Sequence, residues 1–371
     1  MATATAQHDA TPAGDAALRV WLLLGPKHGD NAQLEAVAAA LAERLPCDLR
    51  RLHLAFHRCE LLVNLLLGVS PAGLSARARR SLPSDDAPDL LLTAGRRNEP
   101  VARWLQRAGG MHAALVHCGR PWADPRRFDL VLSTTQYELD DRRWPNVVVL
   151  PLPPAAPRPV GSTPPAADAP LLLVVGGDSG SKQLPPGVAL AIFERSLALA
   201  SALARPLRVI TSPRTRRESE AALLDAASAA GADAHGWHAD RSTNPYEEWL
   251  AEAGAYVVTE DSVSMVADAA DHGRPLWFAA LERDPRPWWA TKAGWGWAAA
   301  THELAQRFAP RRFRRDTRRL LDALVRSGRA RWLAEDAIRA FEPTGSDRAS
   351  SARTAADEIV TRVLKRETAR R

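Results

Sequence analysis

The stretch LLLVVGGDSGSK, residues 171–182, joins a run of five apolar residues to a glycine-rich turn. A second stretch of this kind, VWLLLGPKHGDNAQLEAVAAALAERL, occupies residues 20–45. In each, an apolar run of strand length leads through glycine into residues with helical periodicity. The glycines allow a sharp turn, and the unpaired N–H groups of a helix start attract an anion. The repeat therefore predicts two α/β halves, each opening with a unit that can approach a charged ligand.

Further short apolar runs follow each opening unit. In the first half they lie at residues 88–95, 112–119, 128–134 and 146–153, and in the second at 207–212, 233–239, 255–261 and 275–281. Continuous apolar character is typical of strands that are buried on both faces, as in a parallel sheet covered by helices. The predicted fold class is α/β, with two facing Rossmann-like doubly wound parallel-sheet domains and an interdomain cleft.

Proline marks the division between these halves, because residues 151–170 contain eight prolines and cannot continue a helix or a central strand. The predicted organisation is a flexible tail over 1–18, an N-terminal α/β domain over 19–153 and a linker over 154–170. A C-terminal α/β domain follows over 171–342. Residues 343–371 are predicted to form a helix that packs back on the first domain.

Composition favours a globular cytoplasmic protein. Of the 371 residues, 46% are hydrophobic and 25% are charged, which is ordinary for soluble domains. The three cysteines show no CxxC spacing, so we expect neither a disulfide framework nor a structural metal site. The first residues lack the apolar segment of a secretory signal, and no apolar run reaches the length of a membrane span.

Positive charge gathers in one stretch of the chain. Ten arginines but only two aspartates lie between Arg307 and Arg331, although the whole chain has 49 Lys and Arg against 43 Asp and Glu. The stretch could bind an anionic membrane surface, which predicts a peripheral location on the inner membrane, or it could be a solvated face. Nucleic acid is not expected as a partner, because no aromatic-basic recognition motif accompanies the charge.

Three loops of the second half follow predicted strands, and ligands of open α/β sheets bind at that edge. The first loop offers backbone N–H groups, polar side chains and an ammonium for a phosphate: Gly176, Gly177, Asp178, Ser179, Gly180 and Lys182. In the second loop, Arg214 could meet a diphosphate in bidentate fashion. In the third, Glu260 or Asp261 could accept from a ribose hydroxyl, while the helix start at Ser262 holds a phosphate. A plain glycine turn, a solvated arginine and a helix cap are the alternatives.

The turn that opens the first half offers two candidates for a general base, His28 and Asp30. Either residue could instead be a surface or capping residue. An acceptor-binding wall is predicted from residues of this turn and of two later loops: Gly25, Gly29, Asn31, Arg96, Arg97, Asn98, Gln136 and Tyr137. These residues could bind an acceptor or only anchor the helices that follow.

Eight motifs that span nearly the whole chain carry a resemblance to a known family. They are GPKHGDNAQ (from 25), AGRRNEPVARW (94), HCGRPWA (117), FDLVLSTTQY (128), GGDSG (176), TSPRT (211), NPY (244) and VVTEDSVSMVADA (257). With them the chain resembles the mitochondrial-fission ELM family of plants and its bacterial homologues, which are often labelled nucleoside-diphosphate-sugar epimerases. Thr135 departs from the motif, where proline is expected.

Members of this family resemble GT-B glycosyltransferases, in which the second α/β domain holds a nucleotide sugar and the first an acceptor. The resemblance implies a donor site around Gly176, Gly177, Arg214, Asn244, Asp261, Ser262, Ser264 and Met265, with Tyr246 of the NPY motif beside them. It also implies an inverting glycosyl transfer that needs no metal and no cofactor beyond the donor, with His28 or Asp30 as the base.

The epimerase label does not agree with the sequence. An NAD-dependent epimerase needs GxGxxG after its first strand and a Tyr-x-x-x-Lys pair. The turn at Gly25 lacks the middle glycine, and no lysine follows Tyr137, Tyr246 or Tyr256 at that spacing. A second hypothesis is a non-catalytic interaction protein on the same fold, because the plant relatives are known for recruiting a fission partner.

Overall fold

The structure is a computed structural model of the chain. It describes residues 7–9, 17–57, 68–83, 87–107, 113–139, 141–155, 166, 168–179, 182–240, 243–283, 315–334, 341–343 and 350–365. The chain divides into two compact units. Unit 1 comprises Met1–Pro157, Pro310–Arg315 and Ala349–Arg371, and unit 2 comprises Arg158–Ala309 and Asp316–Arg348.

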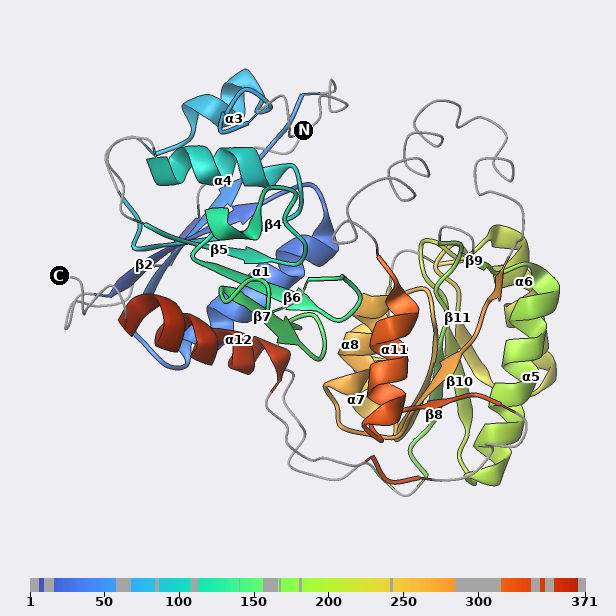
Figure 1. The fold of residues 1–371 in the computed structure, drawn as a ribbon. Helices are drawn as coiled ribbons and strands as arrows, with labels where there is room; N and C mark the ends of the chain where they lie inside the picture. The colour runs from blue at the N-terminus through green and yellow to red at the C-terminus, as the bar shows by residue number, and fades with distance from the viewer. Residues whose placement is uncertain are drawn as a thin grey trace. The chain divides into compact units, whose positions relative to one another are not determined.

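Unit 1 is built on a seven-stranded sheet in the order β1-β3-β2-β4-β5-β6-β7 (Figure 1). Its strands are β1 (Gln7–Asp9), β2 (Leu18–Leu24), β3 (Cys47–His53), β4 (Leu90–Ala94), β5 (Ala114–Cys118), β6 (Leu130–Thr134) and β7 (Val147–Leu150). All neighbours are parallel except β1, which pairs antiparallel with β3. The strand order reverses at β2 and β4, so the carboxyl ends of these two strands form the topological switch point where such sheets bind ligands.

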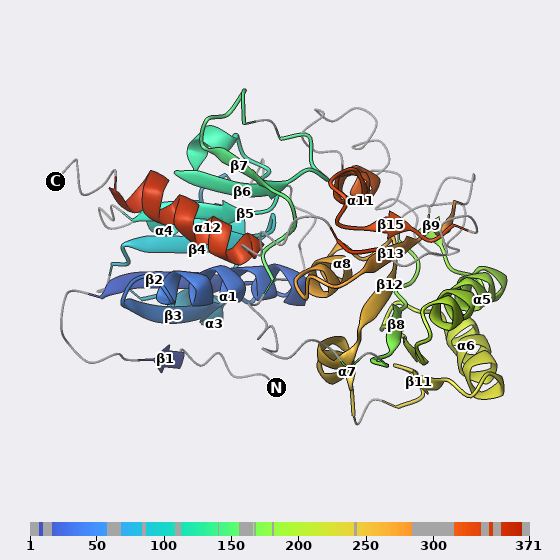
Figure 2. The same ribbon diagram turned by 90° about the horizontal axis from the view of Figure 1, so that it is seen from below.

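Helices cover both faces of this sheet. They are α1 (His28–Ala42), α3 (Ala76–Arg80), α4 (Asn98–Arg107) and α12 (Ser351–Ile359), which continues as a π-helix over Val360–Leu364; a 3-10 turn spans Pro125–Arg127. In Figures 1 and 2, α1 and α12 lie on one face and α4 lies on the other. The C-terminal helix is thus part of the core of unit 1, where Ile359 is fully buried.

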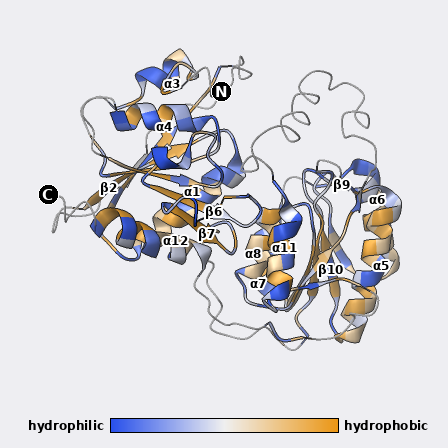
Figure 3. Ribbon diagram, viewed as in Figure 1, coloured by the Kyte–Doolittle hydropathy of each residue, from blue (hydrophilic) through white to orange (hydrophobic). Residues whose placement is uncertain are grey.

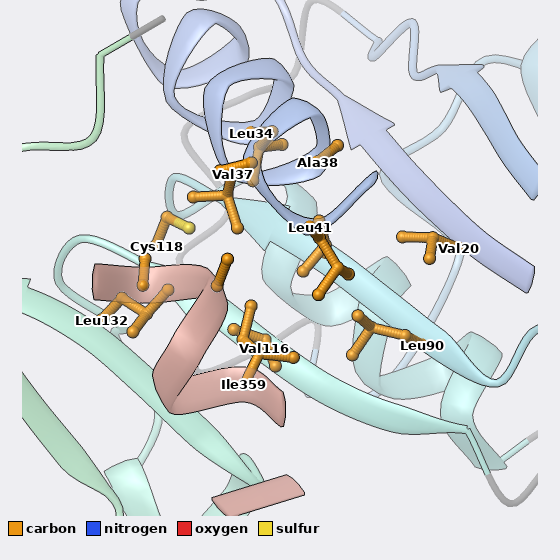
Figure 4. Close-up of a cluster of buried hydrophobic side chains, with 14 of the residues drawn as sticks. Val20, Leu34, Val37, Ala38, Leu41, Leu90, Val116, Cys118, Leu132 and Ile359 are labelled. Atoms are coloured by element: carbon orange, nitrogen blue, oxygen red, sulfur yellow. The ribbon is translucent and has the colours of Figure 1, made fainter. Parts of the chain in front are cut away.

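Alternate residues of each strand point to opposite faces, and both sets are apolar. Figure 4 shows Val20, Leu90, Val116 and Leu132 packed with α1 and α12. Their chain neighbours Trp21, Leu91, Leu115 and Val131 pack on the opposite face with α4. This two-sided burial is the physical reason for the continuous apolar runs in the sequence.

Unit 2 holds a six-stranded sheet in the order β11-β10-β8-β12-β13-β15, in which every pairing is parallel. The strands are β8 (Leu171–Val174), β10 (Leu207–Ile210), β11 (Asp233–His235), β12 (Ala255–Thr259), β13 (Leu276–Ala279) and β15 (Arg331–Trp332). A separate two-stranded sheet pairs β9 (Lys182–Gln183) with β14 (Glu282–Arg283). In the main sheet, β8 lies beside β12 at the point where the order reverses.

The helices of unit 2 are α5 (Pro186–Ala202), α6 (Arg217–Ala229), α7 (Tyr246–Glu252), α8 (Val263–Ala270) and α11 (Thr317–Arg326). In Figure 1, α5 and α6 lie on one face of the sheet, and α8 and α11 lie on the other. Figure 3 shows the same elements with apolar strands between amphipathic helices. The α/β class, with two Rossmann-like parallel sheets, is confirmed.

Some elements differ from those that the sequence predicted. Residues 7–9, placed in a flexible tail, form the short edge strand β1, and β2 begins at Leu18. The strands β3 and β15 were not expected. Most of the proline-rich linker lies outside the described residues.

Candidate functional site

The three predicted donor loops of unit 2 meet at its switch point, and Asp261 joins them. Its side chain is fully buried. Oδ1 accepts a hydrogen bond from the Thr259 hydroxyl at 2.7 Å, and Oδ2 accepts one from the Gly177 N–H at 3.0 Å. The Arg214 Nη2 lies 2.8 Å from the same Oδ2. One carboxylate therefore ties the ends of β8, β10 and β12 together.

Burial raises the pKa of Asp261, and the Arg214 charge and the hydrogen bonds from Thr259 and Gly177 oppose this rise. Both oxygens already have protein partners. The structure thus gives Asp261 a positioning role, whereas the contact with a ribose hydroxyl remains a prediction.

Two glycines permit this close approach of the loops. A Cβ on Gly176 would lie 2.6 Å from Cγ of Asp261 and nearer still to its oxygens. A Cβ on Gly177 would lie 2.8 Å from the Thr215 nitrogen and nearer to the carbonyl oxygen of Arg214. Neither position has room for a side chain, so the glycines at 176 and 177 are required by packing.

Hydroxyls that were not singled out from the sequence complete the cluster. The carbonyl oxygen of Gly176 accepts from Ser212 Oγ at 3.1 Å and from Thr215 Oγ1 at 2.5 Å. The Gly176 N–H donates to Thr259 Oγ1 at 2.8 Å. The available signal was position, since each hydroxyl stands within a few residues of a strand's carboxyl end.

Arg214 is the exposed partner of a buried ion pair. Its side chain is 42% exposed, whereas that of Asp261 is 0% exposed. The guanidinium is therefore held at the edge of the sheet by an acid that solvent does not reach. Its remaining N–H donors belong to the planar fork that binds phosphate oxygens in pairs.

Lys182 and Glu260 form an ion pair with each other. The sequence had predicted the Lys182 ammonium beside a phosphate and the Glu260 carboxylate beside a ribose. Lys182 Nζ lies 2.9 Å from Oε2 of Glu260 and donates to Thr317 Oγ1 at 2.9 Å. Oε1 of Glu260 accepts from the Leu281 N–H at 3.0 Å, and its side chain is 1% exposed. Both charges are thus used inside unit 2.

The rest of the first loop is also held by internal contacts. Asp178 accepts from the Leu184 N–H at 3.0 Å and from Arg216 Nε at 2.8 Å. Ser179 forms a backbone bridge with Lys182. Gly180 lies outside the described residues. The loop is shaped by these bonds, and its contact with a phosphate remains a prediction.

The helix α8 begins beside this cluster. Ser262 is its N-terminal flanking residue and is buried. Its side chain does not cap a backbone N–H of the helix, but its Oγ forms a 3.3 Å hydrogen bond with Oγ of Ser264. Ser264 is exposed and Met265 is half-buried. Because no side chain caps α8, its first N–H groups have neither an intrahelical acceptor nor a side-chain cap.

Asn244 and Tyr246 stabilise the neighbouring helices. Oδ1 of Asn244 accepts from the Tyr246 N–H at 3.1 Å, at the start of α7. The Tyr246 hydroxyl donates to Asp268 of α8 at 2.9 Å. The NPY motif therefore links α7 to α8. Its contact with a nucleotide sugar stays a prediction.

In unit 1, two amides fix the turn that opens the domain. Asn31 accepts from the Gly25 N–H at 2.9 Å and donates to the Gly25 carbonyl at 2.8 Å. Asn98 Nδ2 donates to the Leu23 carbonyl at 2.7 Å. Asn31 and Asn98, both predicted on the acceptor wall, therefore hold the turn at the switch point of this sheet.

Asp30 and His28 have different environments. His28 is exposed at the first position of α1, and a Cβ on the nearby Gly29 would have no heavy atom within 4 Å. Asp30 is half-buried, and Gly95 (φ +76°) approaches it so closely that a Cβ there would lie 2.5 Å from Oδ2. Burial raises the pKa of Asp30, while the charges of Lys27 and Arg315 lower it.

The later loops of unit 1 bring cations and rings together. The guanidinium carbon of Arg96 lies 5.5 Å from the Trp122 ring centre, and that of Arg120 lies 5.3 Å from the Tyr137 ring centre. Arg315 Nε donates to Gln136 Oε1 at 2.9 Å. Among the predicted wall residues, Arg96 is exposed, Arg97 and Tyr137 are half-buried, and Gln136 is buried. Arg120 and Arg315 were not predicted as site residues.

The arginine-rich stretch is described only in part. In that part, α11 buries Leu320, Leu321 and Leu324. The guanidinium of Arg318 lies 4.1 Å from the Trp332 ring centre and that of Arg331 lies 4.6 Å from the Phe341 ring centre. Some of this charge is thus used within unit 2, and an anionic membrane partner remains a prediction.

Within the described ranges, no group of three His, Cys, Asp or Glu side chains is placed to hold a metal ion. No helix in the same ranges has the length and apolar character needed to cross a bilayer.

The two sheets with polar loops at their switch points define a protein of the doubly wound α/β class. The chain belongs to the mitochondrial fission ELM1 family, whose model matches residues 28–363. This match confirms the resemblance inferred from the eight motifs.

Several solved structures are distantly similar. The glycotransferase of kitacinnamycin is 12% identical with a TM-score of 0.45, over 94% of this chain and 95% of that chain. A glycosyltransferase of avilamycin A biosynthesis is 14% identical with a TM-score of 0.43, over 95% and 98%. A UDP-GlcNAc 2-epimerase of Methanocaldococcus jannaschii is 10% identical with a TM-score of 0.40, over 94% and 100%. No curated protein matches the chain.

Proposed function

We propose that unit 2 binds the diphosphate of a nucleotide sugar at the switch point between β8 and β12. We further propose that the protein transfers the sugar to an acceptor, with inversion and without a metal. The observation that carries the first proposal is the ion pair of Arg214 with Asp261, in which an exposed guanidinium is fixed by a fully buried acid. Such a fixed fork loses little side-chain entropy when it binds a phosphate.

The surroundings of Arg214 support the same assignment. Ligands of open α/β sheets bind outside the carboxyl ends of the strands where the strand order reverses. Here Gly176 and Gly177 bring backbone close to that point, and α8 starts there without a side-chain cap. Backbone N–H groups at a helix start are favourable partners for a phosphate.

For the transfer step we assign the general base to Asp30 rather than to His28. Asp30 is half-buried at the switch point of unit 1, and burial raises the pKa of its carboxyl. A base works best when its pKa is near the working pH, so this shift favours proton abstraction from an acceptor hydroxyl. His28 is exposed at the first position of α1.

The donor assignment is tested by calorimetric titration of the full chain with UDP-, GDP- and ADP-sugars. Removing Arg214 deletes charge-assisted hydrogen bonds, which contribute about 1.5–3 kcal/mol each, so Arg214→Ala should weaken binding by at least about tenfold. Arg217→Ala is the matched control, because Arg217 is an exposed arginine three residues further along. The double variant Arg214→Ala/Asp261→Asn should bind as weakly as Arg214→Ala while removing the uncompensated buried charge.

Binding that Arg214→Ala weakens and Arg217→Ala leaves unchanged supports the donor site. If no nucleotide sugar binds the wild-type chain at millimolar concentration, the donor proposal fails and the non-catalytic interaction protein is favoured. The base is tested separately by single-turnover transfer. Asp30→Asn should abolish the chemical step with donor affinity unchanged, whereas equal loss in His28→Ala would contradict the assignment.

A further inference from the structure

Three arginines gather at the carboxyl edge of the unit 1 sheet. Arg96 follows β4, Arg120 follows β5, and Arg315 lies against the end of β6. The first two stand two residues beyond their strands, and parallel strands end at one edge of the sheet. Arg315 comes from a distant part of the chain but belongs to the same unit.

Arg315 is fixed by backbone and side-chain contacts. It forms an isolated antiparallel bridge with Tyr137, and its Nε donates to Oε1 of Gln136 at 2.9 Å. Gln136 is itself 5% exposed and donates to Thr134 Oγ1 at 2.9 Å. A chain of hydrogen bonds therefore runs from the last residue of β6 to the Arg315 guanidinium.

Aromatic rings hold the other two guanidiniums. Arg120 is half-buried and lies over the Tyr137 ring, and Arg96 lies over the Trp122 ring. A guanidinium that stacks on a ring uses its flat face, while its N–H donors lie in its plane, where a phosphate is bound in bidentate fashion.

The three like charges act on one another. Burial lowers the pKa of Arg120, and the charges of Arg315 and Arg96 lower it further, whereas Tyr137 raises it. Arg315 also acts on the carboxyl of Asp30, which links the cluster to the assigned base. Arg120 is half-buried, whereas Arg96 and Arg315 are exposed, and a doubly charged anion bound by all three would reduce the repulsion that Arg120 experiences.

We propose that this arginine cluster, Arg96, Arg120 and Arg315, binds a phosphate monoester on the acceptor, next to the hydroxyl that Asp30 deprotonates. The description of the ligand as an acceptor rests on the proposed function. The anion site itself depends only on residues of unit 1. A doubly charged phosphate suits several guanidiniums better than a single carboxylate does. The phosphate monoester can belong to a soluble molecule or to a lipid such as phosphatidic acid.

The site is tested on the full chain with glycerol phosphate, by calorimetry at fixed ionic strength. We expect saturable binding that Arg120→Gln and Arg315→Gln each weaken by at least about tenfold, since each removes charge-assisted hydrogen bonds. Arg107→Gln is the control, because Arg107 is exposed at the end of α4 in the same unit. Flotation with phosphatidic acid or phosphatidylcholine vesicles forms the second arm.

The two arms separate the possible sources of the phosphate. Loss of glycerol phosphate binding in Arg120→Gln identifies a soluble acceptor, and loss of phosphatidic acid binding alone identifies a lipid acceptor. The inference is overturned if neither probe binds in a saturable way, or if Arg107→Gln weakens binding as much as Arg120→Gln does.

A matched pair of variants separates this site from the donor site. Arg214→Ala should leave glycerol phosphate binding within twofold, and Arg120→Gln should leave nucleotide-sugar binding within twofold. If Arg214→Ala alone abolishes glycerol phosphate binding, the phosphate occupies unit 2 and the inference for unit 1 fails. If nucleotide sugars do not bind but the arginine cluster still binds the phosphate, the proposed donor function fails and the anion site remains.

Discussion

Replacing Gly177 by alanine tests how the loops of unit 2 are packed. A Cβ at this position would lie 2.8 Å from the Thr215 nitrogen, whereas ordinary contact is 3.4–4 Å, and it would lie nearer still to the Arg214 carbonyl. The loop that carries Arg214 must therefore move by at least about 0.6 Å, since both neighbouring atoms belong to the backbone.

Overpacking of this kind costs about 1–3 kcal/mol, and the reduced entropy of the unfolded alanine chain offsets about 0.4–1 kcal/mol. We expect Gly177→Ala to lower the free energy of unfolding by about 1–2 kcal/mol. For a unit of this size that corresponds to a fall in Tm of about 2–8 °C. Because Arg214 moves with its loop, affinity for a nucleotide sugar should fall as well.

Differential scanning calorimetry measures the change, with Gly187→Ala as the control in the same unit. Gly187 lies in the first turn of α5, and a Cβ there would have no heavy atom within 4 Å. Alanine should therefore leave Tm unchanged or raise it, because it favours helix by up to about 1 kcal/mol. If Gly177→Ala melts at or above the wild-type temperature, the packing argument for this loop is refuted.

Three further predictions concern buried charges and thiols. Lys182→Met should destabilise unit 2 by about 3–5 kcal/mol in thermal unfolding, because it leaves the buried Glu260 carboxyl without its nearest cation. The double variant Lys182→Met/Glu260→Gln should recover most of this loss, and no recovery would contradict the pairing. Burial lowers the pKa of His117 to about 3 in the folded state, whereas the unfolded chain has a pKa of about 6.5. As the pH falls below about 6.5, the unfolded chain gains a proton on His117 and the folded protein does not, so the free energy of unfolding decreases. Between pH 7 and 4.5 the wild type should therefore lose about 2–3 kcal/mol more than His117→Leu in urea unfolding, and equal slopes would refute this. Burial, with the Asp30 charge, raises the pKa of Cys118 to about 12, so iodoacetamide at pH 8 should alkylate Cys118 only after unfolding, as peptide mass spectrometry can show.

The fold was predictable where strands are buried on both faces. The run Leu90–Ala94 is buried at every position, so four of its five residues are apolar and the run is recognised directly as a strand. The strand β3, CDLRRLH, does not show the apolar pattern of a strand because its two arginines are accommodated by tertiary contacts. Arg51 pairs with Glu35 of α1 at 2.9 Å, and Arg50 lies 5.5 Å from the Trp21 ring centre.

Short strands at sheet edges were also beyond the sequence pattern. The strand β15 has only two residues and is defined by its parallel pairing with the edge of β13. The strand β1 pairs antiparallel with β3, and its sequence QHD carries no apolar alternation. Such pairings depend on the neighbouring strand rather than on local residues.

The candidate site was predictable in its loops but not in its partners. Position after a strand singled out Gly177, Arg214 and Asp261, and the structure brings these three residues together. The pairing of Lys182 with Glu260 joins residues 78 positions apart, and that of Arg315 with Gln136 joins residues 179 apart. A single sequence contains no signal for contacts of that range, so neither pairing could be predicted from the residues themselves.

The central claim is that the Arg214 guanidinium, which the buried Asp261 carboxylate holds in place, binds a diphosphate at the end of β8. The most direct test compares the dissociation constants of a nucleoside diphosphate and its parent nucleoside, with wild-type protein and with Arg214→Ala. The account predicts that the diphosphate binds the wild type at least about tenfold more tightly than the nucleoside does, and that this advantage disappears in Arg214→Ala. Equal affinities in the wild type, or an advantage that survives without Arg214, would contradict it.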